Sequence, residues 1–186
     1  MRTIIQQWGG LGFVGRVAIT VLTGVTWAVR SLQAVLFDPD YWDPVTSADF
    51  FAVYSYSAAF LLTAASLLIL REAVRPAPQL SATILVVAGA CAVTGIANGV
   101  EDGLGLKGFG PLYVIGVLVS GLGMFVIAAM FRTAPARGLT FVPALGGLTM
   151  VLMTIGGGVL GLPAWLGFGA ILVRERWSPR TAPSGA

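Results

Sequence analysis

The sequence contains no histidine, a single cysteine (Cys91) and a single lysine (Lys107). Without histidine it lacks the most common metal ligand and the usual general base, and it cannot hold a bis-histidine haem. One cysteine excludes an intramolecular disulfide, a CxxC pair and a thiolate cluster. The lysine lies in a glycine-rich connector, so it does not offer a mid-helix Schiff base for retinal. We therefore expect no metal site and no cofactor.

Charge is also scarce. Charged residues make up 10% of the 186 residues, hydrophobic residues make up 56%, and the mean hydropathy is +0.88. A soluble domain carries roughly 25% charge. The basic residues are scattered between apolar segments and form no stripe that would bind nucleic acid. This composition predicts an all-α, polytopic transmembrane helix bundle.

Four segments have the length of about 20 apolar residues that a membrane helix needs, namely 13–37, 50–70, 81–100 and 111–131. A fifth, 139–173, would reach about 52 Å as one helix, against a hydrocarbon core of about 30 Å. Glycines 156–158 and Pro163 lie near its middle and favour a turn. Six spans are therefore favoured, with 139–157 and a thin 162–173 as the last two. Five spans with a long or re-entrant last segment remain the alternative.

The charges predict the orientation. Six spans put nine basic residues on one side, namely Arg2, Arg16, Arg71, Arg75, Arg132, Arg137, Arg174, Arg176 and Arg180. The other side holds two, Arg30 and Lys107. By the positive-inside rule both termini are cytoplasmic, in a bacterial cytoplasmic membrane. Residues 1–177 then form one transmembrane domain that begins with an uncleaved signal anchor, and 178–186 form a disordered cytoplasmic tail.

Polar residues recur at helical spacing in the first and third spans. Arg16, Thr20, Thr23, Trp27 and Arg30 share one face of the first span, and Cys91, Thr94, Asn98 and Glu101 share one face of the third. Lipid cannot satisfy such faces, so we expect them to turn inward, toward each other or toward a hydrated cavity. Because their depths match, an Arg30–Glu101 ion pair is expected. Asp49, Tyr54 and Asp102 would complete this cluster with Trp27 and Asn98.

Each of these features also has a simpler structural explanation. The Arg30–Glu101 pair can serve only to lock two helices together. Thr46-x-x-Asp49 is a capping-box pattern that starts a helix. The acidic, aromatic segment 38–44 lacks calcium-loop spacing and is expected to anchor at the membrane interface. The many glycines of the later spans are expected to let helices pack closely.

Three functions remain open. The first is a non-enzymatic membrane subunit or partner with an outward-facing polar cluster. The second is an intramembrane enzyme of cyclase or isomerase type, in which Glu101 or Asp102 would be the catalytic acid acting on a lipid or isoprenoid. The third is a small carrier, which the lack of a continuous ionisable relay disfavours. Expected partners are membrane lipid, an apolar small molecule, a membrane protein or a second copy in a homodimer.

Overall fold

The computed structural model describes residues 10–37, 44–134, 137–153 and 156–177, without the side chains of 10, 11, 176 and 177. The described residues form six α-helices and no strands. The helices are α1 (Gly10–Leu36), α2 (Ser47–Val74), α3 (Pro78–Asn98), α4 (Gly110–Thr133), α5 (Phe141–Val151) and α6 (Gly161–Trp177). Three shorter helical turns join them: η1 (Gly99–Gly103), η2 (Arg137–Leu139) and η4 (Gly157–Leu160). The predicted all-α bundle is confirmed.

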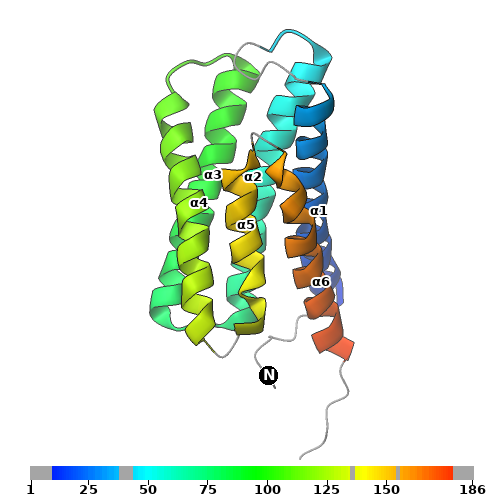
Figure 1. Cartoon of the computed structure of the whole chain (residues 1–186), viewed down its shortest axis with the longest axis vertical. Helices are drawn as coiled ribbons and strands as arrows, with labels where there is room; N and C mark the ends of the chain where they lie inside the picture. The colour runs from blue at the N-terminus through cyan, green and yellow to red at the C-terminus, as the bar shows by residue number, and fades with distance from the viewer. Residues whose placement is uncertain (1–9, 38–43, 135–136, 154–155, 178–186) are drawn as a thin grey trace, which may run out of the picture.

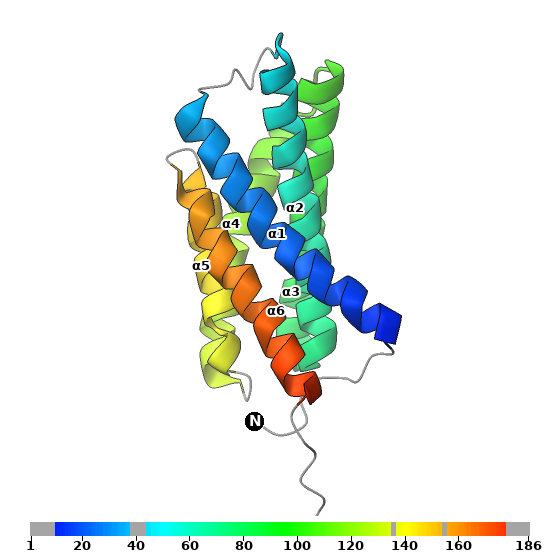
Figure 2. The same cartoon turned by 90° about the vertical axis from the view of Figure 1, so that its right-hand side faces the viewer.

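The helices run alternately up and down, so that α1 begins and α6 ends at the same end of the bundle (Figures 1 and 2). Each helix packs against its neighbours in the sequence, and α6 packs back against α1, which closes the ring. The first four helices reach the far end of the bundle, whereas the connection between α5 and α6 lies part-way along it (Figure 1).

Five helical segments are long and apolar enough to cross a membrane. The exception is α5, whose 11 residues extend about 16 Å. The predicted break in the fifth apolar stretch is confirmed, but the prediction of a thin final arm is wrong. Helix α6 has 17 residues because it continues past Val173 to Trp177. Helix α5 is the short arm, since it stops at Val151 and the chain then turns through Gly156, with φ of 87°.

Local signals in the sequence start and stop the helices. The predicted capping box is present: Thr46 Oγ1 accepts from the Asp49 amide, and the Asp49 carboxylate accepts from the Thr46 amide. Helices α3 and α4 each begin with a proline in the first turn, where its missing N–H costs no helical hydrogen bond. Helix α2 ends at Arg75, which adopts a left-handed conformation with φ of 46°.

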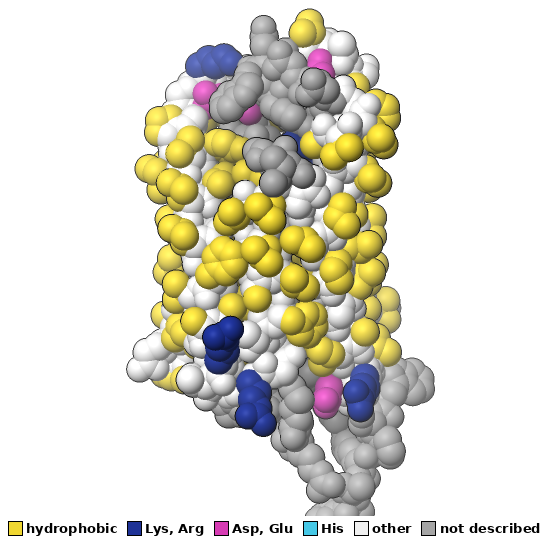
Figure 3. All heavy atoms as spheres, viewed as in Figure 1, with side chains coloured by type: hydrophobic (Ala, Val, Ile, Leu, Met, Phe, Trp, Pro, Cys, Tyr) yellow, Lys and Arg dark blue, Asp and Glu magenta, His cyan; other side chains and the backbone are white. Residues whose placement is uncertain are grey.

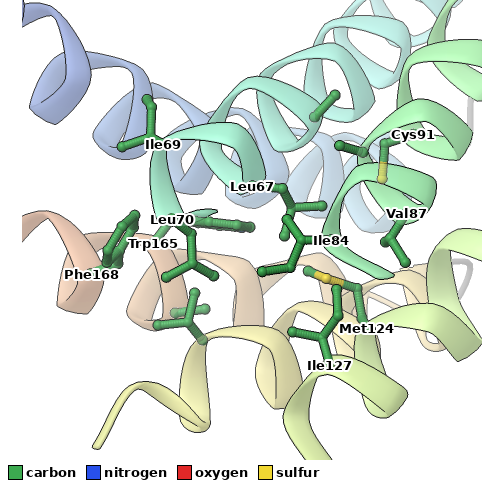
Figure 4. Close-up of a cluster of buried hydrophobic side chains, with 14 of the residues drawn as sticks. Leu67, Ile69, Leu70, Ile84, Val87, Cys91, Met124, Ile127, Trp165 and Phe168 are labelled. Atoms are coloured by element: carbon green, nitrogen blue, oxygen red, sulfur yellow. The ribbon is translucent and has the colours of Figure 1, made fainter. Parts of the chain in front are cut away.

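The core is apolar and aromatic, with side chains from all six α-helices, and Figure 4 shows part of it, where α2, α3, α4 and α6 meet. Glycines let the surrounding helices approach each other. A Cβ at Gly95 would lie 2.8 Å from the carbonyl oxygen of Ser57, and one at Gly158 would lie 2.6 Å from that of Trp27. The predicted close packing at glycine is therefore confirmed within the chain.

Charged side chains lie near the two ends of the bundle, and the face between them is hydrophobic (Figure 3). We call the end where α3 meets α4 the acidic end, because it carries Asp49, Glu101 and Asp102, with Lys107 as its exposed cation. We call the opposite end, where α2 meets α3 and α4 meets α5, the basic end. Its described basic residues are Arg16, Arg71, Arg75, Arg132, Arg137 and Arg174.

Candidate functional site

The polar face predicted for the first span turns inward. Thr20, Thr23, Trp27 and Arg30 are all buried. Two of them bond to α2: the hydroxyls of Thr23 and Ser66 are 2.8 Å apart, and Trp27 Nε1 donates to Thr63 Oγ1 at 2.9 Å. Thr20 Oγ1 donates to the carbonyl oxygen of Val17 on its own helix at 2.8 Å. The two bonds to α2 hold α1 against that helix in a part of the bundle where lipid offers no acceptor.

The polar face of α3 also meets α2. Asn98 is buried, and its side-chain amide donates to the carbonyl oxygen of Val53 at 3.1 Å and to Ser57 Oγ at 3.0 Å. The two polar faces therefore do not face each other directly, because α2 packs between α1 and α3. Sequence neighbours form adjacent pairs in the ring, and α2 is the most buried of the spans.

This arrangement makes the predicted Arg30–Glu101 ion pair wrong, since neither a salt bridge nor a hydrogen bond joins these two described residues. The guanidinium carbon of Arg30 lies 5.2 Å from the centre of the Tyr56 ring, which places the cation over an aromatic face. The Glu101 carboxylate lies instead at the start of α4, where a Cβ on Gly110 would be 3.3 Å from Oε1. The first turn of a helix favours an anion.

A cluster of aromatic and polar side chains surrounds Arg30, and we call it the tyrosine cluster. It consists of Trp27, Arg30, Tyr56, Tyr113 and Met153. The hydroxyls of Tyr56 and Tyr113 are 3.0 Å apart, and the Tyr56 hydroxyl donates to Met153 Sδ at 2.7 Å. The Trp27 and Tyr56 rings meet edge to face, with centres 6.1 Å apart. The cluster thus links α1, α2, α4 and the segment that follows α5.

The two predicted catalytic carboxylates lie in η1, a single π-helical turn that extends α3. Glu101 Oε2 is buried and has no hydrogen-bond partner among the described residues. Asp102 is partly buried and lies within electrostatic range of Glu101 and Lys107. π-Helical turns occur often at functional sites. Among the described candidate carboxylates, that of Asp49 caps α2, whereas those of Glu101 and Asp102 make no hydrogen bond to a described residue.

The remaining predicted site residues serve other contacts. Asp49 caps α2 and accepts from Thr46 Oγ1 at 2.7 Å. Tyr54 is 45% exposed, and its hydroxyl donates to the carbonyl oxygen of Gly103 at 3.0 Å. The predicted single cluster is thus divided into the tyrosine cluster, the Asn98 contacts, the η1 carboxylates and the start of α2.

Sequence reasoning missed part of the tyrosine cluster. It selected neither Tyr113 nor Met153. One signal was available, because a tyrosine within an apolar span needs a partner for its hydroxyl. Sequence reasoning placed Arg16 on the inward polar face of the first span, whereas the Arg16 guanidinium is partly exposed and forms an ion pair with Glu72 on the neighbouring helix at 2.9 Å. The predicted interfacial segment lies at 38–44, of which the structure describes only Pro44.

The chain matches no protein-family model, and no curated protein or solved structure is significantly similar to it. Its function is therefore argued from its own residues.

Proposed function

We propose that this chain is a non-enzymatic subunit or partner protein of a membrane assembly. The observation that supports the proposal is that its buried polar side chains are used between helices. Asn98 bonds α3 to α2, Trp27 bonds α1 to α2, and Tyr56 bonds α2 to Tyr113 on α4. A side chain that binds a substrate must direct its polar atoms to that substrate, whereas these atoms hold the bundle together.

The proposal includes an orientation and a location. We place the basic end in the cytoplasm and the acidic end outside a bacterial cytoplasmic membrane, with both chain termini inside. The support is the contrast between six described arginines toward one end and two described basic residues, Arg30 and Lys107, toward the other. Any assembly partner would then contact the lipid-facing surfaces of the spans or one of the two ends.

The test is purification of the tagged chain from its native membrane in polymer-bounded lipid discs. Proteins and small molecules in the same sample are then quantified by mass spectrometry. An unrelated multi-helix membrane protein with the same tag serves as the control. The proposal predicts a membrane protein in near-stoichiometric amount that is missing from the control. A sample holding the chain alone, or a second copy only, would contradict it.

A second candidate is the intramembrane enzyme, and Glu101 favours it. Its Oε2 atom is buried without a hydrogen-bond partner among the described residues, in a π-helical turn whose Asp102 lies within electrostatic range of Tyr113. In its protonated form this carboxyl group would donate a proton to an alkene carbon of an apolar lipid or isoprenoid, and the resulting carboxylate would then take a proton from a neighbouring carbon, which leaves an isomer of equal mass. The aromatic rings of Trp27 and Tyr56 would stabilise the resulting carbocation by cation–π contact.

The variant Glu101→Gln separates the two candidates, with Glu72→Gln as the matched control, because Glu72 lies at the basic end. An enzyme predicts that folded Glu101→Gln retains a bound lipid or isoprenoid that the wild type converts to an isomer of equal mass. A subunit predicts no such difference and an unchanged set of co-purified proteins in both folded variants. Retention of full turnover by Glu101→Gln would remove Glu101 from any mechanism.

A further inference from the structure

Large apolar side chains are exposed at the acidic end, beyond the lipid-facing belt. We call them the aromatic rim; they are Phe50, Phe51 and Tyr54 at the start of α2, and Leu104, Leu106 and Phe109 between η1 and α4. The most exposed is Leu104 at 65%, followed by Phe51 at 60% and Leu106 at 56%. Exposed apolar groups in contiguous patches mark surfaces that contact something other than water.

The rim is held in a defined shape by backbone contacts. The Leu106 amide donates to the carbonyl oxygen of Val100 at 3.2 Å, which folds the connector back onto η1. Gly105 and Gly108 have φ of 69° and 112°, values that L-residues with side chains rarely adopt. The Tyr54 hydroxyl bonds to Gly103 and so joins the two halves of the rim. Its apolar side chains therefore point outward because the backbone fixes them there.

The rim continues a surface that lipid already covers. Ile96 on α3 is 56% exposed, and Leu112 and Ile115 on α4 are 49% and 57% exposed. These residues belong to the spans on either side of the connector. The connector also carries exposed Lys107, the one lysine of the chain. Aromatic side chains and lysine gather at the level of lipid headgroups, where the ring is partly buried and the ammonium group meets phosphate.

We propose that the aromatic rim is a lipid-binding surface, immersed in the phospholipid headgroup layer, with Lys107 in contact with lipid phosphate. Leu104, Leu106 and Phe51 extend into the boundary between headgroups and acyl chains, which removes their apolar area from water at about 25 cal/mol per Å². The occupant is the phospholipid of the surrounding bilayer rather than a protein. The inference is independent of whether the chain is a subunit or an enzyme.

Site-directed spin labelling tests this surface on the full chain. Cys91 is fully buried, and Cys91→Ala leaves a background in which single cysteines at positions 51, 106 and 115 take the label. The protein is reconstituted in vesicles of phosphatidylethanolamine and phosphatidylglycerol. Collision rates with oxygen, which enters the acyl region, and with a water-soluble nickel chelate give the depth of each label. Doxyl-labelled lipids in the same vesicles calibrate that depth, and position 115 is the belt control.

The proposal predicts labels at 51 and 106 at the level of the phosphate or just below it, with the label at 115 deeper by about 9 Å, the rise from residue 109 to 115. It also predicts that Lys107→Glu moves the label at 106 toward water, because a carboxylate is repelled by phosphate. Rim labels as accessible to the nickel chelate as a free label in water would overturn the proposal. Rim labels shielded from both reagents would also overturn the proposal, because they indicate a protein or a second copy on the rim. An unchanged depth of the label at 106 in Lys107→Glu would overturn it as well.

Discussion

At the scale of single residues, the interior of this bundle combines satisfied and unsatisfied polar groups. The buried face of α1 could be predicted from the spacing of Thr20, Thr23 and Trp27, because a polar stripe in a span has to avoid lipid. The partner of each residue could not be predicted, since the helical period fixes a face but not the neighbouring helix. For this reason Arg30 was assigned to Glu101, whereas the structure places it over Tyr56.

Two buried tryptophans give a matched pair for the first prediction. Trp27 and Trp165 are 1% and 0% exposed, but only Trp27 has an acceptor for its indole N–H among the described residues. Trp27→Phe leaves Thr63 without this donor, so we expect it to lower the free energy of unfolding by about 1 kcal/mol more than Trp165→Phe does. Unfolding in mixed micelles of dodecyl maltoside and dodecyl sulfate measures both. Equal losses would show that the Trp27 hydrogen bond adds no stability.

At the scale of the helices, apolar length and local signals predicted most boundaries. The capping box at Thr46 and the break near Gly156 were predicted because they depend on nearby residues. The ring order was not, because it depends on which surfaces fit together. Gly116 illustrates this, since the sequence indicates a close contact at the glycines of the later spans but does not identify the Ala90 carbonyl oxygen on α3 as the neighbour of Gly116.

A second prediction compares two glycines of α3. A Cβ at Gly95 would lie 2.8 Å from the Ser57 carbonyl oxygen, whereas a Cβ at Gly89 would meet nothing within 4 Å. Gly95→Ala has to push α3 away from α2 and is expected to destabilise the protein by about 1–3 kcal/mol. Gly89→Ala is expected to be neutral or to stabilise by up to about 1 kcal/mol, because alanine favours the helix. The same micelle unfolding assay measures both, and a Gly95→Ala protein as stable as Gly89→Ala would contradict the close approach.

At the scale of the whole molecule, the even number of α-helices places the start of α1 and the end of α6 at the same end of the bundle, and most of the described basic residues lie at that end. The sequence assigned Arg71, Arg132 and Arg137 to one side of the membrane, and the structure places them at one end of the bundle. Helices α5 and α6 form a hairpin that starts and ends at the basic end. Its turn lies part-way along the bundle because α5 extends only about 16 Å. The prediction that the last arm is the short one was wrong, because apolar length alone does not fix where a helix ends: α5 stops at Val151, whereas α6 continues through the charged residues 174–176.

A third prediction follows for sidedness. Single cysteines at the exposed positions Ala48 and Gly138, in the Cys91→Ala background, lie at the acidic and the basic end. In cells whose outer barrier has been removed, we expect a membrane-impermeant maleimide to label position 48 at once. Position 138 should react only after the membrane is permeabilised. The reverse pattern would place the basic end outside, and labelling of both before permeabilisation would contradict a six-helix chain with its connectors on opposite sides.

The central claim is that the buried polar residues hold the helices together. A double-mutant cycle on Tyr56→Phe and Tyr113→Phe tests it most directly, because their hydroxyls are 3.0 Å apart on α2 and α4. The account predicts a coupling free energy of unfolding of about 0.5–1.5 kcal/mol, with each single variant folded and less stable than the wild type. A coupling of zero in folded proteins would contradict the account and leave the tyrosine cluster available for binding or chemistry.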